Sequence, residues 1–249
     1  MTRLAAVLAL LSVVPPIASA VESPPPVHAP VAAGDASYTY TVGPFIAEYE
    51  PPPAGSYTLP AIGRVGDHTL LDSSGAATTL AALKNGRLAV VAFIYTSCAE
   101  AAGCPLSEAI MQRIDRRLAD DPALAARVRL LTISFDPERD RPARMATVRG
   151  AFAPRTDWAF LTTADTAQLQ PILDDFGQPV AKLRYEDGTW TGLFRHVLKV
   201  FLLDEQNHVR NIYSTGLMNP DLVMNDLRTL AGETRAAHGQ RLRADVPSC

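Results

Sequence analysis

The chain has 249 residues, of which 47% are hydrophobic, and its formal net charge is -3. This length and composition suffice for one sizeable hydrophobic core, either as one domain or as one domain with tails. The near-neutral charge balance, without a basic run in the sequence, argues against a nucleic-acid partner, because such partners require a positively charged surface.

Residues 1–20 have the pattern of a secretory signal peptide. Arg3 supplies the positive start, Leu4 to Val14 form the apolar region, and Ala18 to Ala20 form a small-residue cleavage site. The apolar region is shorter than the roughly 20 residues of a membrane span. We therefore expect an exported protein of the bacterial periplasm whose mature chain begins near Val21. An uncleaved signal that anchors it at the inner membrane is the alternative.

Residues 21–56 are rich in proline, with three consecutive prolines at 24–26 and again at 51–53. A segment with so few apolar runs cannot offset its ordering entropy with a core of its own. The sequence therefore predicts a Pro-rich linker or arm over 21–56, a folded domain over 57–232 and a polar C-terminal tail over 233–249.

The most informative stretch of the domain joins a strand, two cysteines and a helix. Residues 88–95 are continuously apolar, as in a strand that is buried on both faces of a sheet. Cys98 and Cys104 follow, and Pro105 suits the first helical position, which puts Cys104 at or near the N-cap. The helix N-terminus favours a thiolate and predicts a lowered thiol pKa. The alternative is an inert structural disulfide, which is common in exported proteins.

The remaining elements alternate strands with helices and end with antiparallel strands, which predicts a mixed α/β sheet flanked by helices. In chain order we expect a hairpin at 69–79, a helical turn at 80–83, a strand at 128–135, a helix at 141–152, a strand at 158–162, a helix at 166–176 that Pro171 kinks or shortens, strands at 182–185, 196–203 and 208–213, and a last helix at 220–230.

This topology brings residues that are distant in the sequence to one edge of the sheet. Right-handed crossovers make the strands at 88 and 128 parallel, so Cys98 and Asp136 both follow carboxyl ends at the same edge. His196 begins the strand over 196–203. If that strand is antiparallel to the strand at 88, His196 faces the cysteine loop.

Three blocks of the sequence resemble the conserved blocks of the Sco/SenC family, over roughly residues 57–231. The blocks are Phe93 to Cys98 with Cys104 and Pro105, Ser134 to Asp140, and Arg195 to Asp204. The resemblance implies a thioredoxin-like fold with an N-terminal extension, in a periplasmic or membrane-tethered protein. It also implies that the protein binds copper, as Cu+ or Cu2+, through Cys98, Cys104 and His196, and helps to assemble the CuA centre of cytochrome c oxidase.

The spacing of the cysteines departs from the family pattern. Five residues, 99–103, separate Cys98 from Cys104, whereas the family has three. The cost of closing a flexible loop grows slowly with its length, so both metal chelation and a disulfide remain feasible. The longer loop alters the geometry and the redox potential of the pair, and could favour electron exchange over copper delivery.

Two functions compete for this pair of thiols. Two thiolates and an imidazole suit copper, whereas a structural zinc site needs a fourth ligand that the sequence does not offer in a finger-like spacing. The leading prediction is a copper metallochaperone whose partner is the CuA-bearing oxidase subunit. The alternative is a periplasmic thiol-disulfide oxidoreductase that uses Cys98 and Cys104 with a periplasmic thiol reductant. A thiol peroxidase, whose usual proline and threonine before the cysteine are missing, and a structural adaptor rank behind both.

The other polar residues have a structural interpretation beside the functional one. Asp136 and Asp140 either end a strand and cap a helix, or tune the site and recognise a partner. We expect the histidines at 28, 68, 208 and 238 to lie on the surface, Trp158 and Trp190 to contribute packing, and Cys249 to be an incidental thiol.

Overall fold

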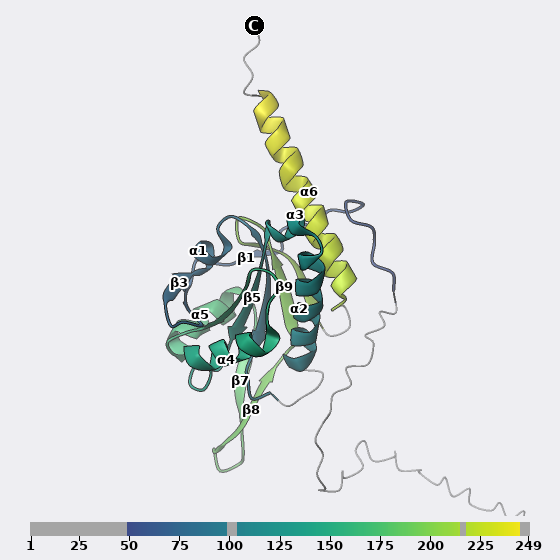
Figure 1. Ribbon diagram of the computed structural model, residues 1–249. Coiled ribbons are helices and arrows are strands. Elements are labelled where there is room, and N and C mark those ends of the chain that lie inside the picture. Colours follow the sequence, from purple (N-terminus) through teal and green to yellow (C-terminus); the bar gives the residue numbers. More distant parts are fainter. Residues whose placement is uncertain (1–48, 99–103, 215–217, 245–249) are drawn as a thin grey trace, which may run out of the picture. The chain divides into compact units, whose positions relative to one another are not determined.

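The computed structural model of the chain describes residues 49–98, 104–214 and 218–244 (Figure 1). All of these belong to one unit, Tyr40–Cys249. The expected signal peptide, most of the Pro-rich linker, the spacer between the two cysteines and Cys249 lie outside the described residues. No described helix combines the length and the apolar character needed to cross a membrane.

The centre of the fold is an eight-stranded mixed sheet with the order β1-β10-β9-β4-β5-β6-β2-β3. Its strands are β1 (Gly63–Arg64), β2 (Thr69–Asp72), β3 (Ala77–Thr79), β4 (Leu88–Ile94), β5 (Val128–Ser134), β6 (Trp158–Thr162), β9 (Lys199–Leu203) and β10 (His208–Ser214). Two further strands, β7 (Val180–Arg184) and β8 (Trp190–His196), form a separate antiparallel hairpin. The expected mixed α/β sheet is confirmed.

Strand β4 lies in the middle of the sheet and is buried along its whole length. It pairs in parallel with β5, from Leu88 opposite Val128 to Ile94 opposite Ser134, and antiparallel with β9. A strand that is covered on both faces has no solvent side, which explains its unbroken run of apolar residues. The predicted parallel arrangement of the strands at 88 and 128 is confirmed.

Helices cover both faces of the sheet. They are α1 (Leu80–Lys84), α2 (Cys104–Ala119), α3 (Pro122–Ala125), α4 (Pro142–Phe152), α5 (Thr166–Asp175) and α6 (Pro220–Ala244). Helices α2 and α4 lie on one face, as right-handed crossovers from β4 to β5 and from β5 to β6 require, with α6 packed against α2, while α5 covers the opposite face (Figure 1). The predicted helix that contains Pro171 runs through that proline without ending.

The last helix is longer than the sequence pattern predicts. We expected it to end at residue 230, and it continues to Ala244. Ala231 is the last buried apolar residue of this helix among the positions whose burial the structure describes. Residues 232–244 contain no proline, the residue that would interrupt the helical hydrogen bonds.

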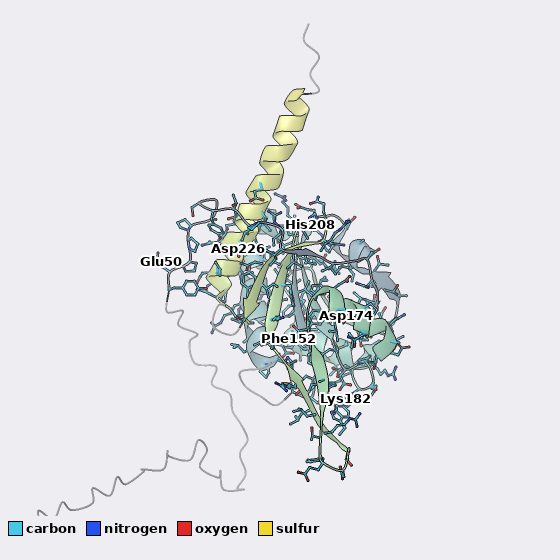
Figure 2. All side chains as sticks on the ribbon, turned by 180° about the vertical axis from the view of Figure 1, so that it is seen from behind. Glu50, Phe152, Asp174, Lys182, His208 and Asp226 are labelled. Carbon is cyan, nitrogen blue, oxygen red and sulfur yellow. The ribbon has the colours of Figure 1, made fainter. Side chains whose placement is uncertain are left out.

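The hairpin of β7 and β8 extends from the end of the sheet at which α2 begins (Figure 1). Figure 2, seen from behind, shows Lys182 on this hairpin, at the opposite end of the domain from His208. The predicted turn at Asp187 and Gly188 closes the hairpin, and Gly188 has a positive φ of 83° that a residue with a side chain rarely adopts.

Candidate functional site

The two cysteines lie where β4 ends and α2 begins. The Cys98 backbone N–H donates to the Tyr95 carbonyl at 3.1 Å, which turns the chain after the strand. Cys104 is the first residue of α2 and its side chain is 2% exposed, whereas Cys98 is partly exposed. Both are present as thiols. Cys98 is therefore the sulfur that a reagent or partner reaches first.

The two sulfurs are in hydrogen-bonding contact. The Cys104 thiol donates to the Cys98 sulfur, and this hydrogen bond, followed by burial, raises the pKa of Cys104 far above its usual value. A hydrogen bond from the Tyr95 backbone N–H opposes the rise without cancelling it. The predicted lowering of the thiol pKa by the helix N-terminus is therefore wrong for Cys104, because the neighbouring sulfur and the loss of solvent outweigh the helix dipole.

Tyr95 connects the cysteines to the hairpin. Its hydroxyl donates to the Cys98 sulfur and accepts a hydrogen bond from the Phe194 backbone N–H. Its ring meets the Phe194 ring edge-on, with the centroids 5.0 Å apart. Burial, followed by the hydrogen bond to Cys98, raises the pKa of Tyr95. The sequence places Tyr95 in the buried strand, but the pattern contains no signal for these contacts.

His196 lies beside Tyr95, but on a different strand from the predicted one. We expected His196 to begin the strand over 196–203; instead it is the last residue of β8 and pairs with Val180, while β9 begins at Lys199. The strand is interrupted because Val197 is exposed and the chain crosses there from the hairpin into the main sheet.

The His196 ring packs among aromatic side chains at the cysteine edge of the sheet. Its centroid is 4.9 Å from that of Phe135 and 6.0 Å from that of Tyr95. Since Tyr95 also contacts both cysteines, the structure brings Cys98, Cys104 and His196 into one neighbourhood. Among the described residues, no three His, Cys, Asp or Glu side chains converge closely enough to hold a metal ion.

Asp140 shapes the loop that carries Cys98. Its buried carboxylate accepts hydrogen bonds from the Thr96 backbone N–H at 2.9 Å, from the Thr96 hydroxyl and from the Ser134 hydroxyl at 2.6 Å. These contacts join the ends of β4 and β5 two residues before Cys98. Of the two roles considered for Asp140, the geometry favours positioning of the cysteine loop.

Asp136 acts on the other side of the site, through Arg139. The Arg139 Nε donates to the buried carboxylate of Asp136 at 2.5 Å, and its Nη2 donates to the Gly192 carbonyl at 3.0 Å. The Arg139 guanidinium also lies 4.0 Å from the centre of the Trp190 ring. Arg139 thereby fastens the loop after β5 to strand β8. Trp190, which we expected to contribute packing, is the aromatic partner of Arg139 in this cation–π contact.

Glu108 is a further residue of the site, outside the sequence motifs that predict it. It lies on α2 one turn after Cys104, and burial, followed by the negative charges of Cys98 and Asp140, raises the pKa of Glu108 to about 7. The signal was present in the spacing, because residues i and i+4 share one face of a helix.

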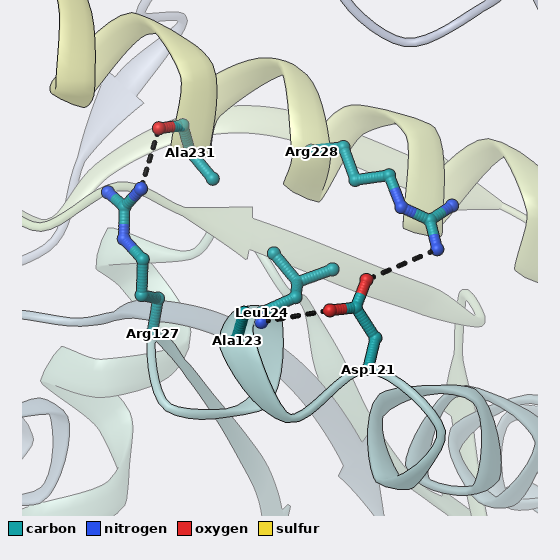
Figure 3. A pocket seen from close by; sticks show the side chains of 6 residues that line it. All are labelled: Asp121, Ala123, Leu124, Arg127, Arg228 and Ala231. Carbon is teal, nitrogen blue, oxygen red and sulfur yellow. Dashed lines mark hydrogen bonds and ion pairs between the residues drawn. The ribbon is translucent and has the colours of Figure 1, made fainter.

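The other polar groups belong to the scaffold. A cavity of about 500 Å³ lies between α3 and α6, where Arg127 donates to the Ala231 carbonyl at 2.6 Å and Arg228 pairs with Asp121 at 3.5 Å (Figure 3). The cavity and the cysteines lie at opposite ends of α2, whose 16 residues span about 24 Å.

Two of the remaining histidines pair with carboxylates in the scaffold. His68 pairs with Asp175 at 2.6 Å, and His208 pairs with Asp204 at 3.0 Å. The side chains of the histidines at 28 and 238 lie outside the described part.

A family model described as SCO1/SenC matches residues 60–232, which is more than half of the chain. The chain belongs to the SCO1/SenC family. The resemblance predicted from the three blocks is thereby confirmed, and with it the thioredoxin-like fold class, which the solved Sco structures share. A search of curated proteins finds no match.

Solved structures of SCO1/SenC proteins resemble this chain over most of their own length. ScoI of Bradyrhizobium japonicum, with copper bound, is 27% identical, and the match covers 68% of this chain and 99% of ScoI with a TM-score of 0.56. A SCO1/SenC lipoprotein of Bacillus anthracis is 24% identical, covering 68% and 95% of the two chains with a TM-score of 0.56. BsSco, a member of the Sco family of cytochrome c oxidase assembly proteins in which a disulfide switch was identified, is 24% identical, covering 68% and 94% with a TM-score of 0.52.

Proposed function

We propose that this SCO1/SenC protein is a periplasmic copper metallochaperone that delivers copper to the CuA-bearing subunit of cytochrome c oxidase. Copper is held by Cys98, Cys104 and His196. The observation that carries the proposal is the contact between the two thiols, next to the hairpin whose last residue is His196. The copper bound to ScoI, the relative at 27% identity, supports the choice of metal.

The donor set fits copper chemically. Thiolate sulfur favours Cu+, and imidazole serves both oxidation states. Binding requires both thiols to release their protons. For Cys104, whose pKa is raised, copper must therefore displace a firmly held proton. Transfer then proceeds by ligand exchange, in which thiolates of the acceptor replace Cys98 and Cys104 one at a time.

The location and partners follow from the same proposal. The pattern at residues 1–20 directs export to the periplasm, with anchoring at the inner membrane if the signal is not cleaved. Export into an oxidising compartment exposes the pair to disulfide formation, which would release the metal. A periplasmic thiol reductant is therefore a necessary second partner.

A Cu+ titration of the reduced mature protein tests the proposed ligands. We expect about one copper per protein, and His196→Ala should weaken the binding at least about tenfold, which corresponds to about 1.4 kcal/mol. His208→Ala is the matched control, because it removes a surface imidazole that pairs with Asp204. A wild type that binds no copper overturns the proposed function. Equal affinity of wild type and His196→Ala removes His196 from the ligand set.

The thiol-disulfide oxidoreductase is the second candidate, and the unequal exposure of the two thiols favours it. In this reaction the Cys98 thiolate attacks a substrate disulfide and forms a mixed disulfide, releasing one substrate thiolate. Cys104 then attacks Cys98, which releases the second substrate thiolate and leaves the protein oxidised. Cys104→Ser should trap the mixed disulfide, and His196→Ala should leave the cycle intact. This alternative would be established if the protein cycled between its dithiol and disulfide forms but bound no copper.

A further inference from the structure

The exposed apolar side chains of the domain are concentrated on one element. Of the five large hydrophobic residues that are exposed in the described part of the chain, four belong to the β7–β8 hairpin and its exit. They are Leu183, Tyr185, Leu193 and Val197, and they are 39%, 61%, 47% and 52% exposed. Single exposed apolar residues are ordinary, but a group of them on one small element marks an interaction surface.

The alternation of the strand separates the two faces of the hairpin. Phe194 and His196 turn toward the domain, where their rings contact Tyr95 and Phe135. Successive side chains of a strand point to opposite faces, so Leu193 and Arg195 point away from these contacts. Val197, the residue after the strand, is exposed to solvent. Ala181, which pairs with Arg195, lies on that outer face as well. We call Leu183, Leu193, Arg195 and Val197 the outer face of the hairpin.

Arg195 gives the outer face its charge. The neighbouring cations on the hairpin have partners within the protein, since Lys182 pairs with Glu138 at 2.7 Å and Arg184 donates to the Gly188 carbonyl at 2.9 Å. The Arg195 guanidinium makes neither an ion pair nor a side-chain hydrogen bond with any described residue. An apolar surface that carries the Arg195 cation, which has no anionic partner among the described residues, is complementary to an apolar surface that carries a carboxylate.

We infer that the outer face of the hairpin is the docking surface for the copper acceptor, which presents an apolar patch with a carboxylate opposite Arg195. The inference rests on the proposed function. Ligand exchange requires the acceptor to reach the metal, so the acceptor must contact the elements that surround His196. Arg195 and Val197 flank His196 in the sequence, so a partner that binds the outer face contacts the strand that carries His196, from the face opposite the imidazole.

Binding of the soluble CuA domain of the oxidase subunit from the same organism tests this surface. The full mature protein is used, both reduced without metal and loaded with Cu+, and the dissociation constant is measured by calorimetry. Leu193→Ser should weaken binding about tenfold, as expected for an apolar residue at the centre of an interface. Arg195→Glu should weaken it at least as much at low salt, with a smaller loss at high salt. Ile62→Ser, which changes the exposed large hydrophobic residue that lies outside the hairpin in the described part of the chain, should have no effect.

The outcomes separate this inference from the proposed function. Copper stoichiometry equal to that of the wild type in both hairpin variants shows that they fold and keep the metal site. Unchanged affinity for the CuA domain in these variants overturns the docking surface and leaves copper binding untouched. A wild type that does not bind the CuA domain overturns it too. The docking surface for the acceptor is also overturned if sedimentation shows a dimer that Leu193→Ser dissociates, because the outer face then binds a second copy of the chain.

Discussion

At the scale of single residues, Tyr95 determines how the cysteines and the hairpin are joined. Its backbone N–H reaches Cys104, and its hydroxyl lies between the Cys98 sulfur and the Phe194 backbone. Hydrogen bonds donated to a sulfur stabilise its thiolate form. Tyr95 is therefore a positioning residue that also favours the reactive state of Cys98.

Tyr95→Phe should slow the alkylation of Cys98 by iodoacetamide at pH 7 about threefold to tenfold. The substitution keeps the ring contacts and removes the hydrogen bond to the Cys98 sulfur, which is worth about 0.5–1.5 kcal/mol, together with the one from the Phe194 backbone N–H. The rate is measured by mass spectrometry of the Cys98 peptide. Tyr185→Phe, at a hydroxyl on the exposed hairpin, is the control and should react like the wild type. Equal rates for all three proteins would contradict this role for the Tyr95 hydroxyl.

Glu108 should make the stability of the reduced protein depend on pH. Its pKa is raised to about 7 in the fold, against about 4.5 in the unfolded chain, chiefly by burial. Between these values the folded state holds a proton that the unfolded state has released, so the free energy of unfolding falls as the pH rises through this window. We expect a loss of about 1–3 kcal/mol from this group between pH 4.5 and pH 8.

Urea unfolding of Glu108→Gln at pH 5 and pH 8 measures this effect. The variant should lose less stability than the wild type over that interval, because glutamine does not titrate. Glu186→Gln, at an exposed position in the hairpin turn, should behave like the wild type. The same pH dependence in Glu108→Gln and wild type would show that another group is responsible.

At the scale of elements, the hairpin is held by contacts from the loop between β5 and α4. Arg139 reaches Asp136 in its own loop, and both the Gly192 carbonyl and the Trp190 ring in β8. Glu138 reaches Lys182 in β7 at 2.7 Å. The position of His196 at the end of β8 therefore depends on a loop whose residues are more than 50 positions away in the sequence.

Arg139→Gln should loosen the hairpin and lower the stability of the protein by about 1–3 kcal/mol, because it removes the cation that pairs with the buried Asp136. Amide exchange should become faster in residues 180–196 than in β4. Arg184→Gln is the control, since the Arg184 guanidinium reaches only the Gly188 carbonyl within the same hairpin. Unchanged exchange in Arg139→Gln would mean that the remaining contacts, which are the Glu138–Lys182 pair and the rings around Phe194, suffice to hold the hairpin.

At the scale of the whole molecule, Asp226 joins three segments that are far apart in the sequence. Its carboxylate on α6 is fully buried and accepts hydrogen bonds from the Tyr57 hydroxyl, from the Tyr213 hydroxyl at 2.6 Å and from the Asn211 amide at 2.7 Å. Burial, followed by the charge of Asp226, raises the pKa of Tyr213. The start of the domain, strand β10 and helix α6 thus share one polar centre.

Asp226→Leu should lower the free energy of unfolding by about 2–4 kcal/mol, because it leaves the buried Tyr213 hydroxyl without its acceptor. Urea denaturation monitored by circular dichroism measures the change. Asp221→Asn, in the first turn of the same helix, should change stability by less than about 0.5 kcal/mol, since its pair with Arg117 is exposed. A small effect of Asp226→Leu would assign the attachment of α6 to its apolar face and its other polar contacts, such as the one between Arg127 and the Ala231 carbonyl.

Local patterns in the sequence determined the elements and the candidate site. The continuous apolar run of β4, the proline at the start of α2 and the two cysteines between them were sufficient to predict the strand, the start of the helix and the thiols, because these signals are local in the sequence. The order of strands and the handedness of crossovers placed Cys98 and Asp136 at the same edge. The three blocks identified the family.

The tertiary structure alone decided the environment of the site. It placed His196 at the end of the hairpin instead of at the start of a central strand, brought Tyr95 and Arg139 into contact with residues of that hairpin and raised the pKa of Cys104. Periodicity records which side chains are buried, but it does not record which distant groups they meet. Hydrogen bonds, ring contacts and solvent exclusion depend on those meetings, and they determine which sulfur reacts and how far the imidazole lies from it.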